Sequence, residues 1–359
     1  MQMEQLSAGR GALTAVRTGT GPDIVVLHSL LADRHAFDPV LPAFAARHRV
    51  TLFNLPGFHG SQPAMLALMD AYVAVIEDGF DEFGIGKDAV LIGNGFGGTV
   101  ALAFALAHPE RISKLVLSDA AAAFPPEGRE AFAVMAEKVA DGGLGSIAEI
   151  AAKRVFSPAY LAAHSEKIEE RKKVLLEIDP KAFQAACKTL QETDLIPLLH
   201  HLRVPTLVVC GQFDQATPPA LNKQIVEKVA GAKYIELPGC GHCPPLEQPE
   251  QFLAAIKDCD CVCGSRVESR RALRGLVLEV SRLDPGHAHA GVAAQGHHRR
   301  HVARLQPRRT DAQAGAGTGT HRRQRGRDPP SVGDLHGGDG SAREVLLRPW
   351  ATPERRWAR

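Results

Sequence analysis

The stretch that decides the fold is Val90-Leu91-Ile92-Gly93-Asn94-Gly95-Phe96-Gly97-Gly98-Thr99-Val100-Ala101-Leu102. It opens with a short apolar run typical of a buried strand, and its last residues favour a helix. The glycines between them indicate a sharp turn, because glycine adopts backbone conformations that other residues avoid. The sequence therefore predicts a strand, a tight turn and a helix, with Gly95 at the centre of the turn.

Strands and helices alternate on both sides of this segment. The apolar patterns predict strands over 12–18, 24–27, 49–53, 89–92, 115–117, 206–210 and 233–237. They predict helices over 36–46, 66–83, 129–140, 146–155, 166–177, 181–191 and 251–257, and an Ala-rich helix that ends at His108. Alternation of this kind predicts an α/β fold, in which helices cover both faces of a mostly parallel sheet.

Residues 120–203 contain no apparent strand, although strands precede and follow them. A helical block inserted between two strands of a parallel sheet can form a lid over the carboxyl edge, where open α/β sheets place their sites. We therefore expect a core made of residues 1–119 and 204–257, with a lid over 120–203.

Beyond residue 257 the composition changes abruptly. Residues 258–359 contain 19 Arg, no Lys and 11 acidic residues, a net charge of +8, whereas residues 1–257 carry −6. The tail also lacks Ile, Phe, Tyr, Asn and Met, as GC-rich DNA read outside its coding frame would. Its arginines are not interleaved with stacking aromatic residues, so we expect a disordered or read-through tail rather than an arm that binds nucleic acid.

The remaining composition favours a soluble cytoplasmic protein, a monomer or homodimer that does not bind membranes. Hydrophobic residues make up 45% of the 359 residues, and no apolar run resembles a signal or a membrane span. The seven cysteines are an odd number and suggest free thiols. Cys240 and Cys243 form a CxxC pair, but no second ligand pair follows at zinc-site spacing. We expect no metal and no cofactor.

Four motifs, in order and at suitable spacing, resemble those of the α/β-hydrolase superfamily, and the likeness spans residues 1–257. They are Leu27-His28-Ser29-Leu30-Leu31, similar to the oxyanion loop; Asn54-Leu55-Pro56-Gly57-Phe58-His59-Gly60-Ser61; the nucleophile elbow Gly93 to Gly98; and Gly239-Cys240-Gly241-His242-Cys243-Pro244-Pro245-Leu246-Glu247-Gln248-Pro249, similar to the loop of the catalytic histidine. Gly95 occupies the position of the elbow nucleophile and has no side chain to form an acyl-enzyme.

The resemblance implies a site at the carboxyl edge of the sheet. His242 would be the base, Asp214 would hold its imidazole in the right tautomer, and the amides of Phe96 and Leu30 would form the oxyanion hole. His28, Ser29 and Asn94 would line the pocket.

Ser29 stands beside His28 where the family usually has Gly. A substitute nucleophile would need its hydroxyl within hydrogen-bond reach of His242. The family geometry places this loop on the oxyanion side, so we expect Ser29 to line the pocket or to bond the backbone.

Three functions remain open for this fold. One is an esterase or enol-lactonase-like hydrolase, of the kind used to break down aromatic compounds, that Gly95 weakens or disables. Another is a hydrolase in which His242 and Asp214 activate water directly. The third is a catalytically silent receptor for a small ligand. Retention of both His242 and Asp214 favours a hydrolase of small esters or enol-lactones without the usual serine, and Gly95→Ser should then raise its activity.

Overall fold

The computed structural model describes residues 2–63 and 68–258. The predicted tail lies, from residue 259 onward, outside the described residues. Within the described part, no helix is both long and apolar enough to cross a membrane.

A single eight-stranded sheet forms the centre of the fold, in the order β1-β2-β4-β3-β5-β6-β7-β8. The strands are β1 (Glu4–Ala8), β2 (Leu13–Thr18), β3 (Asp23–Leu27), β4 (Arg49–Asn54), β5 (Ala89–Asn94), β6 (Ile112–Ser118), β7 (Thr206–Gly211) and β8 (Lys233–Leu237). The pairs β1–β2 and β2–β4 are antiparallel, and every other pair is parallel. The mostly parallel sheet that the sequence predicts is confirmed.

The central strands are covered on both faces. All six residues of β5 and all six of β7 are buried, although successive side chains point to opposite faces of a sheet. Such strands read as continuous apolar runs rather than alternating ones, and this is why the sequence located them.

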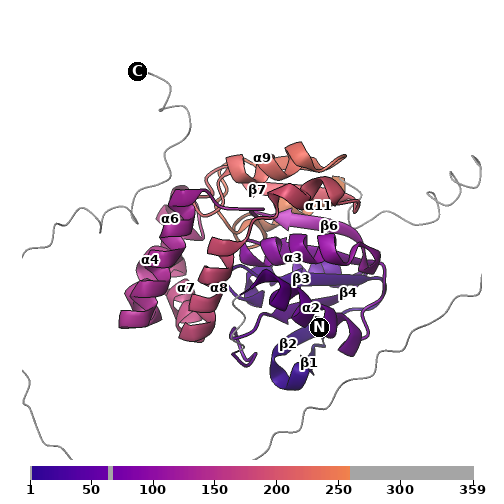
Figure 1. The fold of residues 1–359 in the computed structure, drawn as a ribbon, viewed down its shortest axis with the longest axis horizontal. Coiled ribbons are helices and arrows are strands. Elements are labelled where there is room, and N and C mark those ends of the chain that lie inside the picture. Colours follow the sequence, from indigo (N-terminus) through magenta and orange to yellow (C-terminus); the bar gives the residue numbers. More distant parts are fainter. Residues whose placement is uncertain (1, 64–67, 259–359) are drawn as a thin grey trace, which may run out of the picture. The chain divides into compact units, whose positions relative to one another are not determined.

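Helices connect the strands, and Figure 1 shows α3 lying along the sheet. They are α1 (Leu41–Ala45), α2 (Met69–Glu82), α3 (Phe96–Ala107), α4 (Pro126–Gly142), α5 (Ala148–Arg154), α6 (Pro158–Ala163), α7 (Glu166–Leu176), α8 (Pro180–Glu192), α9 (Pro219–Lys228), α10 (Pro244–Glu247) and α11 (Pro249–Asp258), with the 3₁₀ turns η1 (Gly9–Gly11), η2 (Arg34–Phe37), η3 (Pro109–Arg111), η4 (Leu144–Ser146) and η5 (Ile196–His201).

The inserted block between β6 and β7 is helical. It contains α4 to α8, in which α4 packs against α8 and α5 packs against α7. Figure 1 shows α4, α6, α7 and α8 grouped beside the sheet. Ser157 and Asp179 are the N-cap residues of α6 and α8. The side chain of each accepts a hydrogen bond from a backbone N–H in the first turn, and a proline occupies the first helical position.

Several elements differ from the sequence predictions. The helix expected over 36–46 is broken into η2 and α1, because Pro39 and Pro42 lack the N–H that a continuous helix needs. Strand β1 was missed since it is an exposed edge strand with little apolar content. Helices α6, α9 and α10 were also missed, all short elements that begin at a proline.

Candidate active site

The turn between β5 and α3 has the strained backbone of an elbow. Gly95 has φ +55° and ψ −119°, and it is followed at once by the first residue of α3. Gly97 donates its N–H to the carbonyl of His28, 3.0 Å away, and a Cβ at Gly97 would lie 2.5 Å from that oxygen. Glycine at position 97 therefore lets the elbow pack directly against the loop that follows β3.

Asp214 and His242 come together from the ends of neighbouring strands, β7 and β8. The His242 Nδ1 lies 3.0 Å from both carboxylate oxygens of Asp214. Both side chains are buried. Asp214 also accepts hydrogen bonds from the amides of Ala216 and Thr217 and from the Thr217 hydroxyl. These donors hold the carboxylate in place, and the carboxylate in turn orients the imidazole.

A second buried carboxyl, that of Asp119, lies beside Asp214. Burial opposes ionisation of Asp214, but His242 and the hydrogen bonds from His242 and Thr217 outweigh it, so the pKa of Asp214 is lowered. Burial and the charge of Asp214 raise the pKa of Asp119 well above its usual range. Of the two carboxyls, Asp214 is therefore the one that ionises first.

The Ser29 hydroxyl lies on the other side of the imidazole. Its Oγ is 3.0 Å from His242 Nε2, and both residues are buried. The expectation that the loop geometry keeps Ser29 away from His242 is wrong. The loop after β3 is pulled against the elbow by the Gly97 hydrogen bond, and Gly95 has no side chain to fill the space between Ser29 and His242.

The space above Gly95 is shared by these groups. A Cβ at position 95 would lie 2.4 Å from Ser29 Oγ and 2.8 Å from His242 Nε2. Real Cβ atoms essentially never come closer than 3.0 Å to such atoms. A side chain at position 95 and the Ser29 hydroxyl in its present place therefore exclude each other.

A cavity opens at this point, and its lining is mostly apolar. Its polar lining residues are Ser29, Arg154, Thr217 and His242; the others are Leu30, Leu31, Gly95, Phe96, Phe124, Gly128, Ala131, Phe132, Met135, Leu190 and Ala216. The lining residues come from both the sheet edge and the helices inserted between β6 and β7. Phe96 is the first residue of α3, so its N–H has no partner within the helix.

His28 and Asn94 are not among the residues that line this cavity. The ring of His28 bonds the carbonyl of Ser29 through Nδ1 and accepts the Leu55 N–H at Nε2. Burial lowers the pKa of His28 and favours this neutral form. The Asn94 amide donates to the backbone carbonyls of Ser118 and His242. Both residues brace the loops that carry the site.

Three further residues of the site were missed from the sequence. Asp119 directly follows a buried strand, and this position was the available signal. Glu247 is buried and accepts hydrogen bonds from the Ser157 N–H and hydroxyl and from the Gly241 N–H, so it joins the lid to the His242 loop. Arg154 lies in a helix that carried no motif.

The CxxC pair has no feature of a reactive site. The thiols of Cys240 and Cys243 are free and buried. Burial raises the pKa of both, that of Cys243 to about 12. Because the thiolate is the nucleophile and the metal ligand, protonated thiols of this kind are inert near neutral pH.

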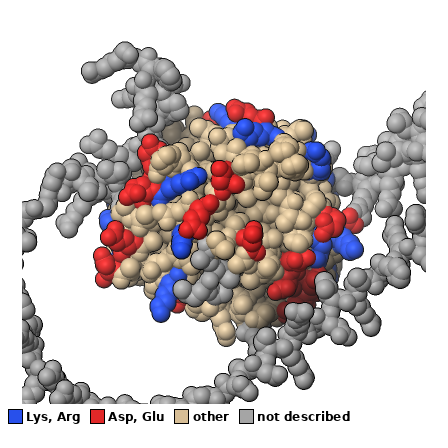
Figure 2. Space-filling view, in the orientation of Figure 1, with Lys and Arg blue, Asp and Glu red and all other residues tan. Residues whose placement is uncertain are grey.

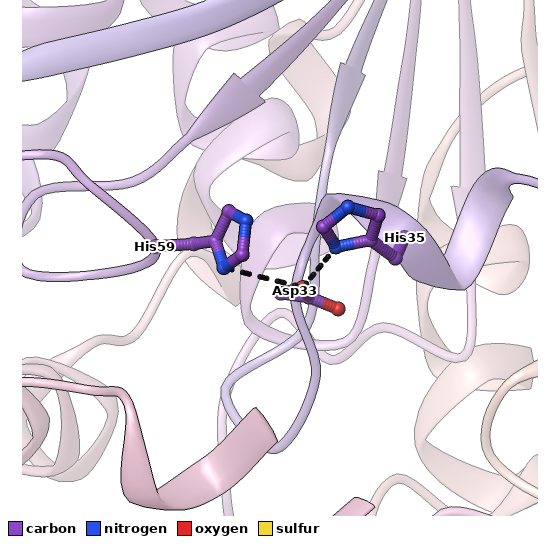
Figure 3. Close-up of side chains that lie close together, drawn as sticks. All are labelled: Asp33, His35 and His59. Carbon is purple, nitrogen blue, oxygen red and sulfur yellow. Dashed lines mark hydrogen bonds and ion pairs between the residues drawn. The ribbon is translucent and has the colours of Figure 1, made fainter. Parts of the chain in front are cut away.

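A separate cluster of ligand-type side chains is formed by Asp33, His35 and His59 (Figure 3), and none of the three lines the cavity. Asp33 Oδ2 lies 2.5 Å from His35 Nδ1 and 3.6 Å from His59 Nδ1. The Arg171 guanidinium is 3.7 Å from the other oxygen of the same carboxylate. This cation already balances the charge of Asp33, so the cluster is accounted for as an ion-pair network.

Known proteins resemble the chain over the described core. A family model described as "Alpha/beta hydrolase family" matches residues 24–255. A pimeloyl-[acyl-carrier protein] methyl ester esterase of Nitrosomonas europaea is 29% identical over 256 residues, which cover 67% of this chain and 96% of the esterase.

Solved structures agree with this match. A thermophilic esterase from Thermogutta terrifontis, solved with malate bound, is 30% identical with a TM-score of 0.65, covering 72% of this chain and 97% of the esterase. The enol-lactonase of Burkholderia xenovorans has a TM-score of 0.66 at 24% identity, covering 71% and 99%, and shows a shared fold. Since the family model spans most of the chain, the chain belongs to the α/β-hydrolase family of enzymes.

Proposed function

We propose that the protein hydrolyses small carboxylic esters or enol-lactones in the cavity above Gly95. The observation that carries this proposal is the orientation of His242. Its Nδ1 is hydrogen-bonded to the Asp214 carboxylate, while its Nε2 contacts the hydroxyl of Ser29, a residue that lines the cavity. The atom free to accept a proton therefore faces the cavity, as a general base requires.

Asp214 supports this role electrostatically. Its lowered pKa keeps it ionised near neutral pH, so it fixes the proton on Nδ1 and stabilises the imidazolium that forms during the reaction. Four donors surround the carboxylate in a buried setting, namely the amides of Ala216 and Thr217, the Thr217 hydroxyl and His242 Nδ1, and they do not need to reorganise when His242 becomes charged.

The amides of Leu30 and Phe96 are proposed to bind the oxyanion. Both residues line the cavity, and Phe96 lies at the N-terminus of α3, where the helix dipole favours negative charge. An oxyanion donor of this kind is commonly worth about 3 kcal/mol of transition-state stabilisation.

The lining also bears on the substrate. Aromatic and aliphatic side chains suit an apolar acyl or alcohol group, and Arg154 supplies a positive charge at the wall. An ester that carries a second carboxylate would place its charge near this guanidinium. The names of two relatives, a methyl ester esterase and an esterase with bound malate, agree with an ester as the substrate.

The test is hydrolysis by the purified full chain of p-nitrophenyl acetate, of a monomethyl ester of a dicarboxylic acid and of an enol-lactone. We expect His242→Ala to lower kcat/KM by at least about 10³-fold. His48 provides a matched control, because it is a buried histidine bonded to the backbone outside the cavity. Binding of these compounds without turnover would instead support a receptor and overturn the proposal.

A further inference from the structure

We propose that Ser29 is the nucleophile of this enzyme and replaces the missing elbow side chain at position 95. The inference rests on the proposed ester hydrolysis and names the residue that would form the acyl-enzyme. Ser29, His242 and Asp214 form a continuous hydrogen-bonded chain, with 3.0 Å between Ser29 Oγ and His242 Nε2 and 3.0 Å between His242 Nδ1 and the carboxylate. A nucleophile, a base and an orienting acid are thus within the distances that such a triad requires.

The direction of the hydrogen bonds follows from the groups involved. Because Asp214 is ionised and accepts from Nδ1, the neutral imidazole carries its proton on Nδ1. Its Nε2 then has a lone pair and accepts the hydroxyl proton of Ser29. This arrangement is the one that turns a serine into an alkoxide-like nucleophile at the moment of attack.

Position 95 explains why Ser29 can occupy this place. The 2.4 Å between an ideal Cβ at position 95 and the Ser29 Oγ means that Ser29 already fills the space of an elbow side chain. The hydroxyl therefore lies close to where an elbow serine would present its own hydroxyl to His242. The proposed nucleophile is thus carried by the loop after β3 and not by the elbow, while His242 remains the base and Asp214 the acid.

The reaction on this arrangement is acyl transfer. Ser29 Oγ attacks the ester carbonyl carbon as its proton moves to His242 Nε2, and a tetrahedral oxyanion forms. The bond from carbon to the alcohol oxygen then breaks, and His242 gives its proton to the departing alcohol. Water attacks the acyl-Ser29 ester with its proton taken by His242, and the acid leaves as Ser29 regains a proton. The net change is ester plus water to acid plus alcohol.

The surroundings suit these steps. Leu30 directly follows Ser29 in the chain and Phe96 directly follows Gly95, and both line the cavity, so their N–H groups are the proposed donors to the oxyanion. The cavity, about 50 Å³ when empty, borders both the Ser29 hydroxyl and His242.

The first test labels the wild-type protein and needs no variant. Diisopropyl fluorophosphate reacts with an activated serine as fluoride leaves, and peptide mass spectrometry identifies the residue. We expect one adduct, on Ser29, that His242→Ala prevents. Ser61 is a matched buried serine whose hydroxyl donates to the Asn54 carbonyl, and Ser61→Ala should be labelled as the wild type is. An adduct elsewhere, or none, overturns the assignment.

The second test separates the nucleophile from the activity. Ser29→Ala should lower p-nitrophenyl ester hydrolysis by at least about 10³-fold, and Ser29→Cys should accumulate an acyl-thioester that mass spectrometry detects on residue 29. If the wild type hydrolyses esters and folded Ser29→Ala keeps its kcat, His242 activates water directly and Ser29 is not the nucleophile. If the wild type labels at Ser29 but hydrolyses no ester, the nucleophile stands and the proposed substrate class falls.

Discussion

A serine added at position 95 should compete with Ser29 for one space. The sequence alone predicts that Gly95→Ser completes a triad, but the structure shows that the new Cβ would lie 2.4 Å from Ser29 Oγ. Something must then move, and overpacking of this kind typically costs about 1–3 kcal/mol. The positive φ of Gly95 adds a further penalty of order 1–3 kcal/mol for any residue with a side chain. We therefore expect the single substitution to destabilise the fold.

Ser29→Gly removes the hydroxyl and the Cβ with which the new side chain would collide. The part of the overpacking penalty that comes from Ser29 then disappears in the double variant, whereas the close approach of the new Cβ to His242 Nε2, 2.8 Å, and the backbone penalty remain. The free energies of unfolding of the wild type, Gly95→Ser, Ser29→Gly and the double variant should thus show a favourable coupling of about 1–3 kcal/mol. The double variant also places a serine on the elbow beside His242, so its ester hydrolysis should exceed that of Ser29→Gly by at least about 10²-fold.

Urea unfolding followed by circular dichroism measures the four free energies, and p-nitrophenyl acetate turnover measures the activity. The wild type and the folded variants should share one m-value, so that the comparison reflects stability. Additive effects, within about 0.5 kcal/mol, would show that the two side chains do not collide. The reasoning that places Ser29 in the elbow's space would then be refuted.

Other substitutions test the surroundings. Asp214→Asn should lower kcat by about 10³–10⁴-fold, because the imidazole loses the carboxylate that holds its tautomer; an unchanged kcat would contradict this. The pKa of Asp119 is raised in the folded state, so the folded protein keeps a proton that the unfolded chain releases above about pH 4. The free energy of unfolding should therefore fall as the pH rises above that value. Asp119→Asn should flatten this decline, measured by urea unfolding at several pH values. Glu247→Ala should lower the free energy of unfolding by roughly 2–5 kcal/mol by leaving buried donors unpaired, unlike the exposed control Glu250→Ala. Ending the chain at Asp258 should leave unfolding cooperative and Tm within a few degrees; loss of folded protein would refute a dispensable tail.

The sequence predicted those elements whose burial produces a recognisable order of apolar residues along the chain. The strands β5 and β7 are covered on both faces, so they appear as apolar runs, and the glycines of the elbow mark a turn whose conformation most other residues avoid. Asp214 and His242 could be paired because the motifs that contain them resemble those of the α/β-hydrolase superfamily. Edge strand β1 and the short helices that start at proline carry no such pattern.

The contact between Ser29 and His242 could not be predicted from any pattern. These residues are 213 positions apart, and their contact depends on the space left by the absent side chain at Gly95. The size of that space follows from how closely the loop after β3 packs on the elbow. Sequence spacing reports the order of such loops along the chain, but it does not report how closely they pack.

The Glu247 bridge has a consequence for how new specificities can arise on this scaffold. Its carboxylate holds the start of α6 through Ser157 and the loop before His242 through Gly241. The inserted helices that line the cavity therefore cannot be exchanged as an independent module. A transplanted set of helices would need a hydrogen-bond donor to Glu247 at position 157. Without that donor, the loop that carries His242 should shift, and the new cavity would lack the histidine. Recombination among relatives should thus be tolerated only where both sides of this junction are inherited together.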